Sequence, residues 1–294
     1  MNNILLSELN QENISTFFKI LSRDSDIPNV SLANIDTKAL SDSLHLCPAA
    51  SFFLAECDSE HKNDVKPIGV MLCSVKDIHA EILLIYIAPK YRRAHLGQNM
   101  MTHGLTLLQA QNVETVSLDV LSNNDAAIGL YRRNGFNQNG TIVTLRNETS
   151  SFYREPKNIT LKETPSLLIM PTIRMFSSGT TLHKDIYKDI TYLSDLAECN
   201  QAEFVTVQQE NKTIGYFIFS RHQNTLRIHH YGFSSDKEQL IFEALSALIK
   251  NSTIVLLQIS GSDSTRIEEF KNNGFYVDFI QEQYIRKISP LQSK

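Results

Sequence analysis

A short basic turn carries the residue types best suited to hold a phosphate-bearing ligand. Lys90, Arg92 and Arg93 form a local basic cluster there, in a chain whose net charge is −4. The segment that follows, 96–111, has apolar residues at helical spacing. The first turn of a helix offers unpaired backbone N–H groups and the positive end of the helix dipole. The pattern therefore predicts a diphosphate site, although a solvated basic turn would have the same composition.

The turn also contains small side chains that let the backbone approach a ligand. Ala94 and Gly97 have this property, and Gly97 falls at the expected start of the helix. The residues predicted to form the site are Arg92, Arg93, Ala94, His95, Leu96, Gly97 and Gln98.

A mixed sheet with helices is expected to position this turn. Hydrophobic patterning predicts strands over 4–9, 51–57, 68–75, 81–88, 116–121 and 141–146, and helices over 11–22, 37–46, 96–111 and 126–134. The fold class is α/β in the broad sense, with an α+β mixed sheet. Three consecutive strands precede the third helix, which excludes a doubly wound nucleotide-binding fold. Asn139-Gly140 predicts a hairpin turn between the last helix and strand 141–146.

The later part of the chain repeats the earlier part. IGLYRRNGF at 128–136 matches IEEFKNNGF at 267–275, and VSLDVL at 116–121 matches VLLQIS at 255–260, both at an offset of 139 residues. Around Gly69 and Gly215 the offset is 146. The second copy has therefore lost 7 residues, and we expect the loss at the turn where the first copy has its basic cluster. Ordered matches of this kind predict two copies of one fold.

The first copy resembles the GNAT superfamily of N-acetyltransferases. The family's acetyl-CoA signature, Gln/Arg-x-x-Gly-x-Gly/Ala, is matched by Arg92 at its first position and by Gly97 at its last. His95 stands where the signature has its first glycine, and a positive φ at that position would strain it. The resemblance implies two tandem GNAT-like acyl-CoA N-acyltransferase domains, an acetyltransferase domain over 1–163 and a degenerate one over 164–294.

A second family motif, Asn-x-x-Ala-x-x-x-Tyr followed by Gly-Phe, is matched in full by Asn124, Ala127, Tyr131 and Gly135-Phe136. The resemblance implies acetyl-CoA as co-substrate, with the backbone of Ile85, Tyr86 and Ile87 bonding the pantetheine amides and the 93–98 turn holding the diphosphate. It also implies that Asn124 bonds the cofactor arm. Tyr131 would act as the general acid that protonates the departing thiolate; the alternative is an aromatic residue packed against the sheet.

Glu81 is the candidate general base. It lies immediately before the apolar run of the central strand, where a carboxylate could take a proton from an ammonium acceptor directly or through water. A solvated strand-end residue is the alternative interpretation. His79 and Asp77 are weaker candidates, and His103 is expected to be structural.

The second copy lacks the features that would bind acetyl-CoA. Phe270 stands in place of Tyr131, and Asp263 stands in place of Asn124. Arg227 takes the position of Glu81, and the basic turn is replaced by GFSSDKEQ. We therefore expect a degenerate domain that covers the acceptor cleft or stabilises the first domain.

Composition excludes several classes of partner. The net charge is −4, from 28 basic and 32 acidic residues, which disfavours nucleic acid and anionic membranes as partners. The apolar stretches fall far short of the ~20 residues of a membrane helix. Four cysteines show no metal-binding spacing, so no metal is expected. His229 and His230, adjacent on a strand, are expected on opposite faces. No secretory signal is visible, so a cytoplasmic protein is expected.

Two functions follow from these patterns. The first is an N-acetyltransferase that moves an acetyl group from acetyl-CoA to a primary amine by direct attack in a ternary complex. The alternative is a catalytically weak acyl-CoA-binding or regulatory module. The acceptor, whether peptide or small-molecule amine, and the oligomeric state stay open.

Overall fold

The structure is a computed structural model that describes residues 3–8, 52–57, 65–148, 153–156, 158–177, 202–249 and 252–289. The helices expected over 11–22 and 37–46, and a further one expected over 187–199, lie outside the described residues.

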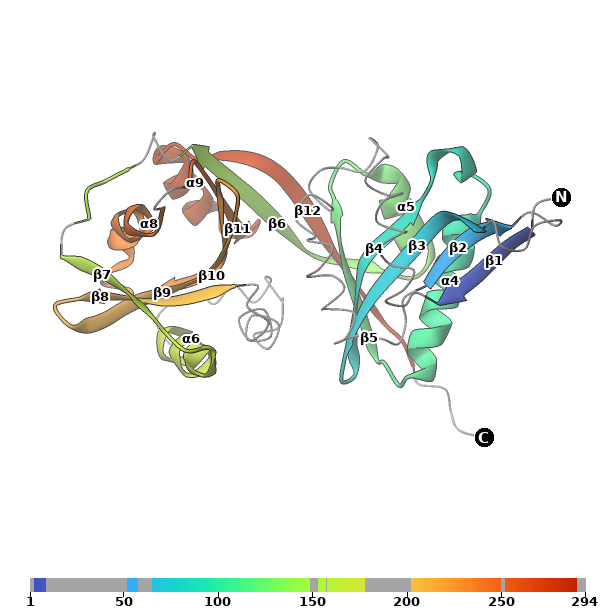
Figure 1. The fold of residues 1–294 in the computed structure, drawn as a ribbon, viewed down its shortest axis with the longest axis horizontal. Helices are drawn as coiled ribbons and strands as arrows, with labels where there is room; N and C mark the ends of the chain where they lie inside the picture. The colour runs from blue at the N-terminus through green and yellow to red at the C-terminus, as the bar shows by residue number, and fades with distance from the viewer. Residues whose placement is uncertain are drawn as a thin grey trace. The chain divides into compact units, whose positions relative to one another are not determined.

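The first copy forms a mixed sheet with helices, as the patterning predicts (Figure 1). Its elements are β1 (Asn3–Glu8), β2 (Phe52–Cys57), β3 (Val65–Lys76), β4 (His79–Ile87), the short 3-10 helix η1 (Pro89–Tyr91), α4 (Leu96–Ala110), β5 (Thr115–Leu121), α5 (Asp125–Arg133) and β6 (Asn137–Glu148). Strands β1 to β4 pair antiparallel in chain order, and β4 pairs parallel with β5. The crossover helix α4 provides the parallel connection.

The second copy repeats this succession. Its elements are β7 (Ile159–Glu163), η3 (Ser166–Leu168), α6 (Ile169–Ser177), β8 (Glu203–Gln209), β9 (Lys212–His222), β10 (Thr225–Phe233), η4 (Glu238–Leu240), α8 (Ile241–Ile249), β11 (Ile254–Ser260), α9 (Ser264–Asn272) and β12 (Tyr276–Lys287). Residues 88–114, 27 in number, connect β4 to β5, whereas residues 234–253, 20 in number, connect β10 to β11. The seven-residue loss therefore falls between these two strands. Residues 88–95 precede α4 and residues 234–240 precede α8, a difference of one, so six of the seven residues are lost after the helix begins. The expectation that the loss lies at the basic turn is therefore wrong.

The two compact units of the structure do not follow the boundaries 1–163 and 164–294. The first unit comprises residues 1–139 and 283–294, and the second comprises residues 140–282. In the first unit the strand order is β1-β2-β3-β4-β5-β12, and in the second it is β6-β11-β10-β9-β8-β7. Each copy therefore gives its last strand to the sheet of the other copy.

Matching hydrogen bonds mark this strand exchange in both units. In the first unit, the Arg286 guanidinium of β12 donates to the carbonyl of Asn134, at the end of α5. In the second, the Asn147 amide of β6 donates to the carbonyl of Asn273, at the end of α9. Arg286 and Asn147 are 139 residues apart, the offset of the repeat. Because the two terminal strands are equivalent, either could complete either sheet, and sequence patterning does not distinguish the two arrangements.

The hairpin turn expected at Asn139-Gly140 is absent from this described part of the chain. Both residues lie inside the continuous strand β6. An Asn-Gly pair makes a hairpin only when the strands on both sides of it pair with each other. Here β6 pairs antiparallel with β11 instead, from Ile142↔Ser260 to Glu148↔Ile254.

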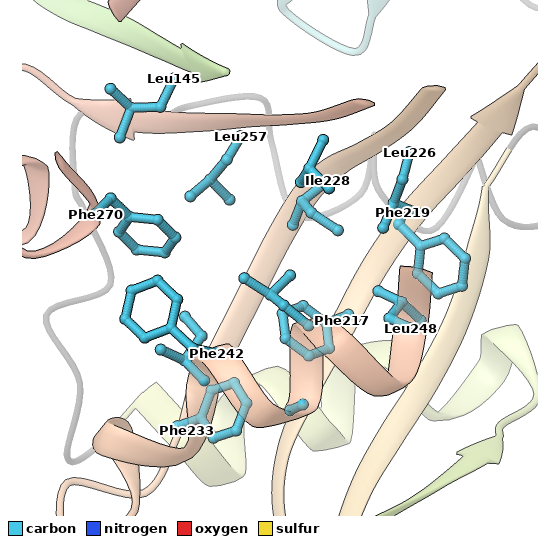
Figure 2. Close-up of a cluster of buried hydrophobic side chains, with 14 of the residues drawn as sticks. Leu145, Phe217, Phe219, Leu226, Ile228, Phe233, Phe242, Leu248, Leu257 and Phe270 are labelled. Atoms are coloured by element: carbon cyan, nitrogen blue, oxygen red, sulfur yellow. The ribbon is translucent and has the colours of Figure 1, made fainter. Parts of the chain in front are cut away.

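Each unit has its own apolar core between its sheet and its helices. In the second unit Phe270 of α9 lies 5.1 Å from Phe242 of α8 and 5.0 Å from Phe275, measured between ring centroids. Figure 2 shows Phe270, Phe242 and Leu145 in this cluster. On the other face of the second sheet, Ile169 and Ile173 of α6 pack with Phe204 of β8.

Both central strands carry a bulge at equivalent positions. In β4 the pairing with β3 passes from Ile82↔Cys73 to Leu84↔Leu72, so Leu83 has no partner in the register. In β10 the extra residue is His229. The expectation that His229 and His230 point to opposite faces is therefore wrong. The first lies 2.9 Å from Ser220 Oγ and the second 3.0 Å from the Tyr216 hydroxyl, and these partners share one face of β9.

Candidate functional site

Strands β4 and β5 separate at the place where the sequence predicts cofactor binding. Their parallel ladder runs from His79↔Thr115 to Ile82↔Leu118. Beyond it, Ile85, Tyr86 and Ile87 remain paired with β3 on their other side. The backbone of these three residues is therefore not used by the β5 ladder, as an extended ligand that pairs with the strand would require. The Leu83 bulge lies directly after the last ladder pair, and bulges are common beside active sites.

The basic turn leads into the amino terminus of a long helix. His95 is the residue before α4, with φ 59° and ψ 5°, and Arg93 also has a positive φ of 62°. The left-handed conformation expected at His95 is therefore present, and it brings strain because His replaces the glycine of the signature. The first turn of α4 contains no acidic residue. Its N–H groups and dipole are well placed to attract an anion.

Arg92 is anchored to the strand that precedes it. Its Nε donates to the carbonyl of Ile87 at 2.9 Å, and its guanidinium lies 5.8 Å from the centroid of the Tyr86 ring. These contacts hold the exposed Arg92 next to the end of β4. They also give the Ile87 carbonyl a partner within the protein, so a ligand amide would compete with Arg92 for it.

Gln98 has a structural partner that the sequence does not reveal. Its side-chain amide exchanges two hydrogen bonds with that of Asn134, with donor–acceptor distances of 2.8 and 3.1 Å. Asn134 also donates to the carbonyl of Leu130 at 2.8 Å. The pair ties the first turn of α4 to the end of α5. We infer that Gln98 would contact a diphosphate through its backbone N–H.

Asn124 caps α5. Its side-chain oxygen accepts a hydrogen bond from the Ala127 N–H at 3.2 Å. Asp263 caps α9 in the same way, accepting from the Arg266 N–H at 2.9 Å. Capping needs only an acceptor oxygen, which both residues supply. An amide nitrogen is present only at Asn124, where it adds a donor without adding a negative charge.

Tyr131 is almost completely buried, with 6% of its surface exposed. Its ring lies 6.1 Å from that of Phe136 and 6.4 Å from that of Tyr284. Burial raises the pKa of Tyr131 well above the usual value of a phenol. The hydroxyl therefore keeps its proton throughout the neutral range, as a general acid must.

Buried tyrosines should make the protein sensitive to alkali. Burial also raises the pKa of Tyr216 in the second unit. A phenol whose folded-state pKa lies above the unfolded value of ~10 stabilises the fold only below that pH. We expect the melting temperature to fall as the pH rises above ~10. The Tyr131→Phe and Tyr216→Phe variants should each lose part of this dependence, and variants that keep the full pH dependence of the unmodified chain would contradict the assignment.

Glu81 is half-buried on the ladder between β3 and β5. Its partners in register are Ser74 of β3 and Ser117 of β5. Its neighbours Ala80 and Ile82 belong to the same buried cluster as Tyr131. Because side chains alternate along a strand, Glu81 faces the opposite side of the sheet from that cluster. The structure thus places the candidate base and the candidate acid on opposite faces of the sheet, with Glu81 one residue before the last pair of the β4–β5 ladder. His79 and Asp77 are exposed near the β3–β4 turn.

In the second unit an ion pair links the segments that correspond to the basic turn and to the start of α5. Arg266, which aligns with Ala127, lies 3.0 Å from a carboxylate oxygen of Glu238 and 3.2 Å from one of Glu269. Only 16% of the Arg266 side chain is exposed. Glu238 stands three residues before α8, as Arg93 does before α4, and Glu243 lies in the first turn of α8, whereas the first turn of α4 has no acidic residue. This arrangement opposes binding of a polyanion.

Within the described ranges, no three His, Cys, Asp or Glu side chains are grouped so as to hold a metal ion. In that same part of the chain, no helix is long and apolar enough to cross a membrane.

Comparison with known families decides the nature of the first copy. The sequence model of the acetyltransferase (GNAT) family matches residues 17–136. The chain contains a GNAT acetyltransferase domain. The match covers the basic turn and both motifs that resemble the family, and it ends at Phe136.

Curated relatives match this chain over short stretches. Mycothiol acetyltransferase of Streptomyces coelicolor is 34% identical over 102 residues, which are 34% of this chain and 31% of the relative. The ribosomal protein bS18-alanine N-acetyltransferase of Escherichia coli is 37% identical over 59 residues, which are 20% of this chain and 40% of the relative. The chain therefore spans less than half the length of these relatives.

Solved structures show the tandem GNAT fold over the whole chain. A GCN5-related N-acetyltransferase from Sphaerobacter thermophilus has a TM-score of 0.69 at 11% identity, covering 98% of this chain and 96% of its own. A tandem GNAT protein from the clavulanic acid biosynthesis pathway has a TM-score of 0.66 at 11% identity, and the match covers 97% of this chain and 98% of that protein. These similarities support the fold assigned to both copies.

Proposed function

We propose that the first unit is an N-acetyltransferase that moves an acetyl group from acetyl-CoA to a primary amine. The observation that carries the proposal is the combination, in one unit, of a separated β4–β5 ladder and a cation-flanked helix terminus. The separated ladder can pair with an extended ligand arm that carries amides, and the helix terminus can bind a diphosphate. Acetyl-CoA has both parts and supplies an activated acetyl group.

Gly97 leaves open space beside the amino terminus of α4. A Cβ atom added at Gly97 would meet only Leu130 of α5, at 3.5 Å. The glycine therefore leaves space beside the open N–H groups of the first turn of α4. Arg92 and Arg93, both exposed, would neutralise part of the charge. Asn124 would offer its amide N–H to the pantetheine arm.

Two proton transfers complete the reaction. Glu81 takes the proton that an ammonium acceptor must lose before its nitrogen can attack the acetyl carbonyl carbon. As the C–N bond forms and the C–S bond breaks, Tyr131 gives its phenolic proton to the departing sulfur. Before the next turnover, Glu81 gives its proton to solvent and the Tyr131 phenolate regains one from solvent. No covalent intermediate on the enzyme is needed.

An amine is the acceptor class that we favour. The name of the Escherichia coli relative describes an alanine N-acetyltransferase, and 59 residues of this chain match it at 37% identity. Glu81 supplies the carboxylate that an ammonium group would seek in a half-buried position.

Release of CoA against a panel of primary amines tests the proposal. The panel should include a peptide amino terminus, a lysine peptide, an amino sugar and a polyamine, and the thiol of free CoA should be measured. We expect acceptor-dependent release with at least one class and a product heavier by one acetyl group. Acetyl-CoA binding without release for any amine would instead favour the alternative, an acyl-CoA-binding module whose loop is strained at His95.

A further inference from the structure

We propose that Tyr284, on the strand that the second copy gives to the first unit, is a positioning residue for the general acid Tyr131. The inference rests on the proposed function. It assigns the degenerate copy a part in the chemistry of the other copy, through a side chain more than 150 positions away from the acid along the chain.

The contact between the two tyrosines lies inside the first unit. Tyr284 is 1% exposed, and its ring centroid lies 6.4 Å from that of Tyr131, with the planes inclined at 45°. Phe136 packs against another side of Tyr131, at 6.1 Å. Aromatic pairs at these separations have preferred orientations. The Tyr131 ring therefore packs between Phe136, which belongs to the same copy, and Tyr284, which belongs to the other copy.

Further contacts fix β12 against the same helix. The Arg132 guanidinium, next to Tyr131 on α5, lies 5.8 Å from the centroid of the Tyr284 ring. Two residues along β12, Arg286 donates to the carbonyl of Asn134. Asn134 in turn holds Gln98 at the start of α4. One strand therefore supports both the candidate acid and the turn expected to hold the diphosphate.

The second unit contains a position equivalent to Tyr284 but no tyrosine equivalent to the candidate acid. Leu145 of β6 is the repeat equivalent of Tyr284, and it is 0% exposed in the cluster that contains Phe270. Phe270 replaces Tyr131 and has no proton to give. If the exchanged strands had only a structural role, changes at Tyr284 and at Leu145 would have the same kind of effect.

A double-mutant cycle in the full chain tests the proposal. Tyr284→Leu should lower kcat for acetyl transfer about tenfold and change the KM for acetyl-CoA less than about twofold, because the acid is mispositioned while the cofactor site remains. Tyr284→Phe keeps the ring and should restore kcat to within about twofold. In a Tyr131→Phe background, Tyr284→Leu should lower kcat no further, since the group it positions is gone. Leu145→Ala should lower the melting temperature and leave kcat unchanged.

The outcomes separate this inference from the function on which it rests. If Tyr131→Phe lowers kcat while Tyr284→Leu does not, the positioning role is wrong and the acid assignment stands. Multiplicative losses in the double variant would also overturn the positioning role. An unmodified chain that transfers no acetyl group would overturn both. Should Tyr284→Leu lack the circular dichroism spectrum of the unmodified chain, Tyr284→Met, with an unbranched side chain that adapts to gaps, takes its place in the cycle.

Discussion

Replacing Tyr131 by Phe should lower kcat by ~10²–10⁴-fold, the usual effect of losing a positioned proton donor. The ring and its packing against Phe136 and Tyr284 would remain, since only the hydroxyl is removed. Acetyl-CoA affinity should therefore stay nearly constant. Steady-state kinetics with the best amine acceptor, together with calorimetry for the cofactor, measures both quantities.

Tyr216→Phe is the matched control. It removes a buried phenol from the second unit, where the hydroxyl lies 3.0 Å from His230 Nδ1. Loss of that hydrogen bond should cost ~1 kcal/mol of stability and leave kcat unchanged. If Tyr131→Phe retained full kcat, the proton would have to come from water or from another residue, and the assigned role would be wrong.

The second large effect is expected at Gly97. Gly97→Asp would place a carboxylate in the first turn of α4, which has no acidic residue of its own. The charge would stabilise the helix terminus by ~0.3–1 kcal/mol but occupy the N–H groups that a diphosphate needs. The added Cβ meets Leu130 only at ordinary contact distance, so the fold should persist. Calorimetry should show acetyl-CoA binding weakened tenfold or more, which corresponds to ~1.4 kcal/mol.

Thr265→Asp supplies the comparison for Gly97→Asp. Thr265 is the exposed second residue of α9, the counterpart of α5 in the second unit, and so has the place in its helix that Gly97 has in α4. The substitution adds the same charge to a helix terminus that we expect to bind no cofactor, and affinity should stay within about twofold. Equal weakening by both substitutions would indicate a general charge effect and remove the basis for placing the diphosphate at Gly97.

Much of the fold could be predicted because both copies carry local sequence motifs that mark the ends of their helices. The Asn-Gly-Phe triplets mark helix ends at which Gly135 and Gly274 take positive φ values of 76° and 86°. Glycine favours this conformation at the end of a helix. The glycine of the signature at the position of His95 indicates that a positive φ there would strain the residue, and the structure has a φ of 59°.

Features that depend on distant partners could not be predicted. No local sequence pattern distinguishes β6 and β12 as exchanged strands. They are the equivalent last strands of the two copies, and each could complete the sheet of either copy. The bulges at Leu83 and His229 depend on the register with β3 and β9, which side-chain alternation alone does not reveal. The Asn139-Gly140 turn was favoured by its dipeptide, and pairing with β11 overrides that preference. The side-chain hydrogen bond between Gln98 and Asn134 joins residues 36 positions apart, and no local sequence pattern indicates it.

We expect the first unit of the chain to bind acetyl-CoA and the second unit to bind none. Calorimetric titration of acetyl-CoA into the full chain tests it most directly. The half-buried ion pair of Arg266 with Glu238, and the carboxylates around it, predict that the second unit takes up none. We expect a stoichiometry of one per chain that is weakened by Gly97→Asp and unaffected by Thr265→Asp. Two equivalent sites, or a single site that survives Gly97→Asp unchanged, would contradict the claim.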